Sequence, residues 1–178
     1  VVTKGPMVVR DADLLAELGR VAHCTVHISV PTVDEEAWSA LEPGTAHPLQ
    51  RLRAVRALRK AGVNAGVLLA PIVPGFTTER RRLEATIRAV AEHNAAFMGS
   101  SVLYLKDGTK DHFMGFLREE FPHLVEGYER LYPGSYAPAA YVEKVKDLVN
   151  ELRQRYALGA RASRMADDQA ADPAATTG

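Results

Sequence analysis

Residues 65–79, AGVLLAPIVPGFTTE, decide the fold of this sequence, because they join an apolar run to a turn and to the start of a charged helix. A continuous apolar run of this length is typical of a strand covered on both faces, as in a parallel sheet flanked by helices. Pro71 and Pro74 cannot donate to a strand ladder, so pairing should stop just before the first of them, and Gly75 lets the backbone turn. Because ligands gather at the carboxyl edge of parallel strands, residues 71–79 are predicted to form the rim of a site.

The rest of the chain alternates strand-like and helical patterns in the same way. The patterns predict strands at 1–4, 23–30, 65–70 and 97–106, and helices at 11–19, 48–61 and 78–94. In the first helix, Leu14, Leu15 and Leu18 are predicted to form the buried stripe. Asp34 is expected to cap the turn at 34–41, and a last amphipathic helix carries an apolar stripe that includes Val145, Val149 and Leu152. Strands that alternate with helices pair in parallel through right-handed crossovers. The sequence therefore predicts an α/β protein whose parallel sheet is either open or part of a barrel.

The strand at 23–30 separates polar from apolar side chains. His27 and Ser29 fall on its polar side, whereas Cys24 and Ile28 fall on its apolar side. A strand whose apolar side meets helices and whose polar side faces inward suits a barrel with a ligand-bearing lumen. We therefore expect His27 to face the lumen and Cys24 to be a small buried side chain.

Composition excludes several classes of protein. Lysine plus arginine equals aspartate plus glutamate at 22 each, so no overall field favours nucleic acid or an anionic membrane. The arginines of the helices at 48–61 and 78–94 are predicted to form solvated faces. The single cysteine excludes internal disulfides and favours a reducing compartment, and no apolar run is long enough to span a bilayer, so the expected location is the cytoplasm.

An ordered set of short motifs resembles a known enzyme family. The motifs are TKGP at 3–6, HISVPT at 27–32, LEP at 41–43, RLRAVRALRKAG at 51–62 and PIVPG at 71–75. Together they resemble the radical S-adenosylmethionine superfamily, most closely the proteins related to spore photoproduct lyase. That resemblance implies a partial (β/α) barrel that holds a 4Fe-4S cluster and S-adenosylmethionine. Electron transfer from an external donor then cleaves the cofactor to a 5′-deoxyadenosyl radical, as in lyase or oxidoreductase chemistry.

On this resemblance, the chain is an incomplete parallel (β/α) barrel that contributes about four strands, with C-terminal helices. The implied domains are barrel at 1–106, a helical extension at 107–158 and a disordered tail at 159–178. The residues expected to bind the cofactor are Lys4, Ser29, Thr32, Ile72, Pro74 and Gly75, with Ser29 at the ribose and the residues from Ile72 to Gly75 beside adenine. The residues expected to bind substrate, whether a small molecule or a macromolecule, are His27, Tyr104 and Lys106.

The cluster ligands of that family are missing from this chain. The family uses three cysteines at CxxxCxxC spacing, because three thiolates leave one iron open for the cofactor. Cys24 stands alone, so no metal ligand is predicted among these residues and no catalytic residue is assigned. Because the chain starts within a strand pattern and without methionine, we expect the cluster segment to lie upstream of Val1. The complete protein is then an enzyme, and these residues alone are inactive.

Three alternatives stay open. A barrel that has lost its cluster is a non-catalytic interaction module. An unrelated aldolase-like barrel would use Lys106 or Lys4 as a Schiff-base amine. Nucleic acid is a possible but disfavoured partner, because the helix arginines are expected to lie opposite the apolar stripes, away from the site.

Overall fold

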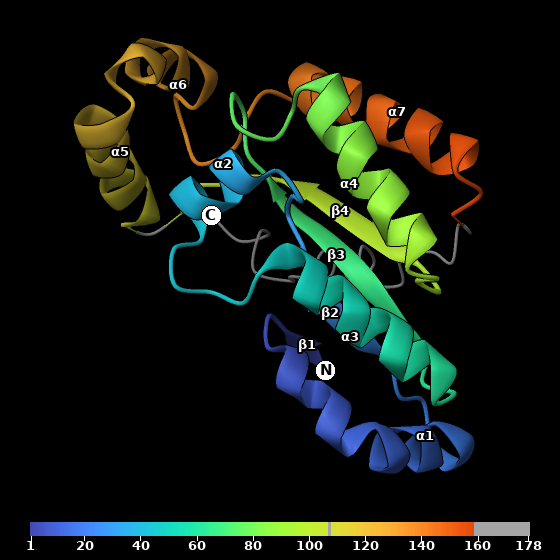
Figure 1. The fold of residues 1–178 in the computed structure, drawn as a ribbon. Coiled ribbons are helices and arrows are strands. Elements are labelled where there is room, and N and C mark those ends of the chain that lie inside the picture. Colours follow the sequence, from blue (N-terminus) through green and yellow to red (C-terminus); the bar gives the residue numbers. More distant parts are fainter. Residues whose placement is uncertain (107, 159–178) are drawn as a thin grey trace, which may run out of the picture.

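A computed structural model of the chain describes residues 1–106 and 108–158. Its centre is a four-stranded sheet in the order β1-β2-β3-β4, with every neighbouring pair parallel (Figure 1). The strands are β1 (Val2–Thr3), β2 (Val26–Ser29), β3 (Ala65–Ile72) and β4 (Met98–Val102). The α/β class and the part-barrel architecture predicted from the sequence are therefore confirmed.

Helices connect and follow the strands. They are η1 (Pro6–Asp11), α1 (Ala12–Val21), α2 (Glu35–Leu41), α3 (Pro48–Lys60), α4 (Arg80–Glu92), α5 (Thr109–Glu120), η2 (Pro122–Leu124), α6 (Val125–Leu131) and α7 (Ala139–Arg155). Local signals explain their starts: Asp34 caps α2 by accepting a hydrogen bond from the Ala37 amide at 3.0 Å, and Pro48 occupies the first turn of α3. The predicted tail, 159–178, lies outside the described residues.

One face of the sheet is buried beneath helices. Ile28, Val67 and Met98 point from β2, β3 and β4 into a core shared with α3, α4 and α7. Figure 1 shows α3 and α4 lying along this face, with α7 beside α4. The side chains of α7 that reach this core include Val145, Val149 and Leu152, which lie on the apolar stripe expected from the sequence.

The opposite face of the sheet corrects the expectation that β3 is covered on both faces. Leu68 and Ala70 point to this side and are only partly buried. At the amino end of the strand, the Phe97 ring lies over Gly66, where an added Cβ would come within 2.5 Å of the ring. Pairing also continues past Pro71 to Ile72, because a register shift between Leu69 and Ile72 removes the proline from the ladder.

The predicted buried stripe of the first helix is wrong. Leu14 is 67% exposed and Leu18 is 47% exposed, and only Leu15 of the three packs against the core. The reason is topological: within the described part of the chain β1 is the edge strand, and α1 there has a neighbour on one side only (Figure 1).

A second core caps the carboxyl end of the sheet. Val73 and Phe76, from the loop after β3, pack with Leu117 of α5 and with Tyr128 and Tyr132. Figure 1 shows α5 and α6 beyond the tips of the strand arrows, on the same side as α2. The C-terminal helices thus enclose the edge at which the sequence predicts a site. Within the described ranges, no helix is both long and apolar enough to cross a membrane.

Candidate functional site

A pocket of about 200 Å³ lies where the segments that follow all four strands meet. It is lined by Lys4, Pro31, Thr32, Trp38, Leu41, Glu42, Pro71, Val73, Leu103 and Phe113. The wall is mostly apolar, and one lysine and one glutamate supply its charges. Ligand pockets typically measure about 300–1,000 Å³, so this one holds only part of a cofactor-sized molecule.

The two charges of the pocket belong to a chain of ion pairs. The Lys4 ammonium lies 2.8 Å from Glu42 Oε1, and Arg51 Nη1 donates to Glu42 Oε2 at 2.8 Å. The glutamate side chain is only 9% exposed, whereas that of Lys4 is 53% exposed. Because one cation sits on each side of one carboxylate, the three side chains together carry a net charge of +1.

Arg51 corrects the expectation that the arginines of this helix face solvent. Its side chain is 0% exposed, and its guanidinium donates to the carbonyls of Ser29 and Ala46, to the Thr45 hydroxyl and to Glu42. Burial of a guanidinium is tolerated only when its donors are satisfied in this way. The spacing held a signal that the sequence reasoning missed, because Arg51 lies four and seven residues before the buried Val55 and Leu58, on the same stripe.

Ser29 and Thr32, both expected at the cofactor, lie at or next to the pocket. Thr32 lines it, and its hydroxyl accepts a hydrogen bond from the Asp34 amide at 3.1 Å. Ser29 is nearly buried and its hydroxyl donates to the Ala70 carbonyl at 3.3 Å. Each hydroxyl thus keeps part of its hydrogen-bonding capacity for a ligand.

The rim segment after β3 meets the pocket through different residues from those expected. The Ile72 side chain packs in the core beneath the helices, whereas its neighbour Val73 lines the pocket. Pro74 is buried, and its carbonyl accepts a hydrogen bond from the Tyr128 hydroxyl. Gly75 is exposed, with a φ of +77° that glycine adopts without strain. Of the three residues expected to bind the cofactor here, Ile72, Pro74 and Gly75, none lines the pocket, which the segment reaches through Pro71 and Val73.

His27 lies on the uncovered face of the sheet and does not line the pocket. Its ring packs against Phe97 with a centroid distance of 4.7 Å. Among the described residues, its Nδ1 atom is buried without a hydrogen-bond partner. Burial, and secondarily the charge of the Val1 amino group, lowers the pKa of His27. The lowered pKa favours the neutral imidazole.

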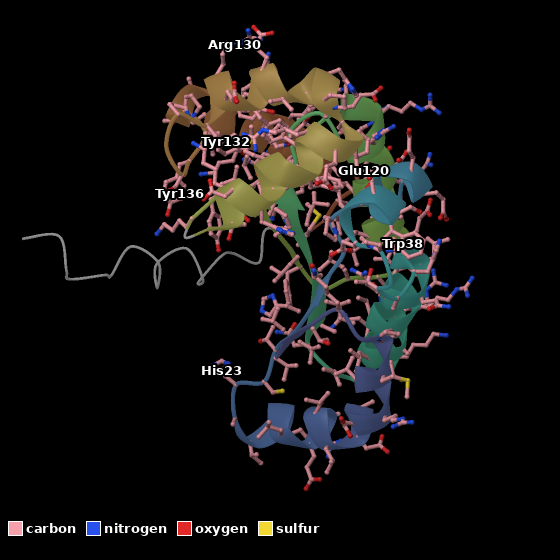
Figure 2. The ribbon with its side chains drawn as sticks, turned by 90° about the vertical axis from the view of Figure 1, so that its left-hand side faces the viewer. His23, Trp38, Glu120, Arg130, Tyr132 and Tyr136 are labelled. Atoms are coloured by element: carbon pink, nitrogen blue, oxygen red, sulfur yellow. The ribbon has the colours of Figure 1, made fainter. Side chains whose placement is uncertain are left out.

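Tyr104 and Lys106 do not line the pocket. Tyr104 forms an antiparallel bridge with Tyr136, and the two rings are 6.0 Å apart and more than half exposed. The Lys106 ammonium lies 5.3 Å from the centre of the Tyr136 ring. Figure 2 shows Tyr136 near Tyr132 at the end of the molecule occupied by the C-terminal helices, far from His23 at the amino end of the sheet.

Metal ligands are absent from the described residues. No group of three histidine, cysteine or acidic side chains there is arranged to hold a metal ion. Cys24 is the single cysteine of the chain and is partly exposed, in contrast to the buried position expected. These residues therefore do not supply the three thiolates that a 4Fe-4S cluster of the CxxxCxxC type requires.

Comparison with other sequences places this chain beside uncharacterized proteins. Uncharacterized proteins of Mycobacterium bovis and Mycobacterium tuberculosis are each 32% identical to it over 159 residues, which is 89% of this chain and 47% of theirs. The chain thus spans about half the length of the curated relatives it matches. No protein-family model matches it.

Comparison with solved structures shows the fold. A mutant of spore photoproduct lyase with bound AdoMet and dinucleoside spore photoproduct is similar with a TM-score of 0.64 and 18% identity, covering 87% of this chain and 47% of the lyase. A second mutant of the same lyase gives a TM-score of 0.62 and 17% identity, with the same coverage. At this identity the likeness establishes a shared fold for the aligned half of the lyase.

Proposed function

We propose that this chain forms part of the barrel of a radical S-adenosylmethionine enzyme, and that its pocket binds a portion of S-adenosylmethionine. The observation that carries the proposal is the pocket itself, which combines Lys4, Thr32 and the apolar wall after β3 at the carboxyl edge of the sheet. The fold shared with a lyase structure that holds AdoMet supports the same ligand. Lys4 and Thr32, which line the pocket, belong to the motifs at 3–6 and 27–32.

The pocket residues fit this ligand in chemistry as well as in place. Lys4 offers the charge that a carboxylate needs, and Ser29 and Thr32 offer hydroxyls for a ribose. Pro71 and Val73 form an apolar wall, as suits the adenine ring. Since the pocket holds only part of the ligand, the remainder would extend over the uncovered face of the sheet.

The cluster belongs to another part of the complete protein in this proposal. With one cysteine, these residues leave the three thiolates to be supplied elsewhere, and the relatives are long enough to hold a further segment. A 4Fe-4S cluster held there would supply the electron that cleaves S-adenosylmethionine to methionine and a 5′-deoxyadenosyl radical. This chain's own part is to bind the cofactor, orient it and exclude water from it.

The uncovered face of the sheet is the proposed substrate side. His27 lies on this face beside Phe97, and Tyr104 and Lys106 stand in the segment after β4. The lyase structure that shares the fold holds a dinucleoside, so a substrate that contains nucleobases is one candidate class.

The test uses the complete protein with its cluster reconstituted under anaerobic conditions. Equilibrium binding of S-adenosylmethionine and release of 5′-deoxyadenosine on reduction are measured for the parent protein, Lys4→Met and Lys60→Met. We expect binding by the parent, a loss of about tenfold or more in Lys4→Met, and no change in the exposed Lys60→Met control on α3. A parent protein that takes up iron and sulfide but binds no S-adenosylmethionine would refute the function and favour a non-catalytic module.

A further inference from the structure

We infer that Glu42, anchored by Arg51, is a positioning residue that holds the Lys4 ammonium in the pocket for an anionic group of the ligand. Neither Glu42 nor Arg51 is among the residues that the motifs assign to cofactor or substrate. The inference rests on the proposed function for the identity of the ligand, S-adenosylmethionine, and it deepens that function by assigning how its carboxylate is recognised.

The Glu42 carboxylate is held in one position. Glu42 follows directly after α2, and Arg51 fixes its Oε2 atom at 2.8 Å. The same guanidinium donates to the Ser29 carbonyl at 3.0 Å and to the Ala46 carbonyl at 2.7 Å. Arg51 therefore ties the end of β2, the loop after α2 and the Glu42 carboxylate into one unit.

The Lys4 side chain has fewer partners than the Glu42 carboxylate. Lys4 stands in the loop after β1 and its side chain is half exposed. The one ion pair found for it among the described residues is with Glu42 Oε1, a buried atom for which no hydrogen-bond donor is found there. A lysine stem has four rotatable carbons, so without this carboxylate the ammonium would sample solvent instead of the pocket.

The charges of Lys4, Glu42 and Arg51 do not cancel. A lone Lys4–Glu42 pair would be neutral and would attract an anion weakly. Because Arg51 compensates the carboxylate from the buried side, the positive charge of Lys4 stays available to a ligand. This arrangement explains why a fully buried arginine lies next to a pocket of mostly apolar walls.

The test compares two ligands that differ only at the anionic group. Affinities for S-adenosylmethionine and for decarboxylated S-adenosylmethionine are measured on the complete protein and on Glu42→Gln. The amide keeps one acceptor oxygen, which Arg51 occupies, and turns its NH2 toward Lys4, so the variant should fold while releasing the lysine. Glu36→Gln is the matched control, because Glu36 lies on α2, which Glu42 directly follows, with its side chain 83% exposed.

We expect Glu42→Gln to lower the preference for S-adenosylmethionine over the decarboxylated analogue by about tenfold, and Glu36→Gln to leave it unchanged. In the Lys4→Met background, Glu42→Gln should have no further effect on this preference. An equal loss of affinity for both ligands would show a merely structural role and overturn the inference. An unchanged preference, or one that rises because Glu42 competes with the ligand carboxylate, would also overturn it.

A readout without ligand separates the inference from the proposed function. Lysines are acetylated with an amine-reactive reagent, and the rate at each lysine is followed by peptide mapping, with Lys60 as the internal reference. Acetylation of Lys4 should be several-fold faster in Glu42→Gln than in the parent. If the parent binds neither ligand but Lys4 responds in this way, the proposed function fails and the positioning of Lys4 stands. If Lys4 reacts at the same rate in both proteins, the positioning fails whatever the ligand.

Discussion

The Phe97 ring lies directly over the backbone of Gly66, so closely that a Cβ on the glycine would come within 2.5 Å of ring carbons and of the Phe97 carbonyl oxygen. The ring also packs against His27 of β2. This contact covers the amino end of the sheet on the face that no helix covers in the described part of the chain, and it makes a glycine necessary near the amino end of an apolar strand.

Gly66→Ala should therefore destabilise the protein by about 1–3 kcal/mol, because neither the ring nor the backbone can move without losing its packing. The free energy of unfolding is measured in urea. Gly19→Ala is the control: no atom lies within 4 Å of its added Cβ, and alanine in a helix should raise stability by about 0.5–1 kcal/mol. Equal effects of the two substitutions would contradict the proposed contact.

Arg51→Met should destabilise the protein by about 3–5 kcal/mol, because it leaves the Glu42 carboxylate buried with only Lys4 as partner. Arg53→Met, on the exposed side of the same helix, should change stability by less than about 0.5 kcal/mol. Thermal unfolding of both variants beside the parent protein checks this, and a mild effect of Arg51→Met would mean that Glu42 is better hydrated than the structure shows.

Tyr128→Phe should cost about 1–3 kcal/mol of stability, since it removes the only hydrogen-bond donor found for the buried Pro74 carbonyl in the described ranges. Tyr136→Phe, at an exposed ring, should be close to neutral. Urea unfolding curves of the two variants provide the comparison. If both are neutral, α6 does not hold the rim after β3 through this bond.

His27 should make stability fall as the solution is acidified. Its pKa in the folded protein is lowered, mainly by burial, so the unfolded chain takes up the proton first as pH falls through about 6.5. The contribution is fully present above that pH and is lost progressively as pH falls toward the folded pKa.

Unfolding free energies from pH 7.5 down to pH 5.5 test this expectation. His27→Gln should flatten the loss of stability over this range. His112→Gln, at an exposed position on α5, is expected to leave it as in the parent. A parent protein whose stability rises on acidification would show that His27 is stabilised in its charged form.

Local patterns predicted most of the elements, because their signals lie within a few residues of one another. The apolar stripe of α7 and the capping residue Asp34 were both readable in this way. The apolar run of β3 likewise identified the strand that lies between two others. The prediction that both faces of β3 are covered was wrong for the face that carries Leu68 and Ala70, since an apolar run does not reveal which face a neighbouring element covers.

The candidate site was harder to predict, because its members come from separate segments. The motifs pointed to Lys4 and Thr32, and both line the pocket. Glu42 and Arg51 were seen only as parts of motifs, and the arginine was assigned to a solvated face. Of the wall expected from Ile72 to Gly75, Val73 lines the pocket, whereas the Ile72 side chain packs in the core beneath the helices.

By itself the sequence determined the alternation of strands and helices, and hence a parallel α/β sheet, because hydrophobic periodicity is a local property of the chain. Only the tertiary structure decided which charges face the pocket. Arg51 is charged but buried, because carbonyls and a carboxylate converge on it. Leu14 is apolar but exposed, because its helix lies at the edge of the described sheet. Burial depends on neighbours that are distant in sequence, and these are known only once the strands are placed.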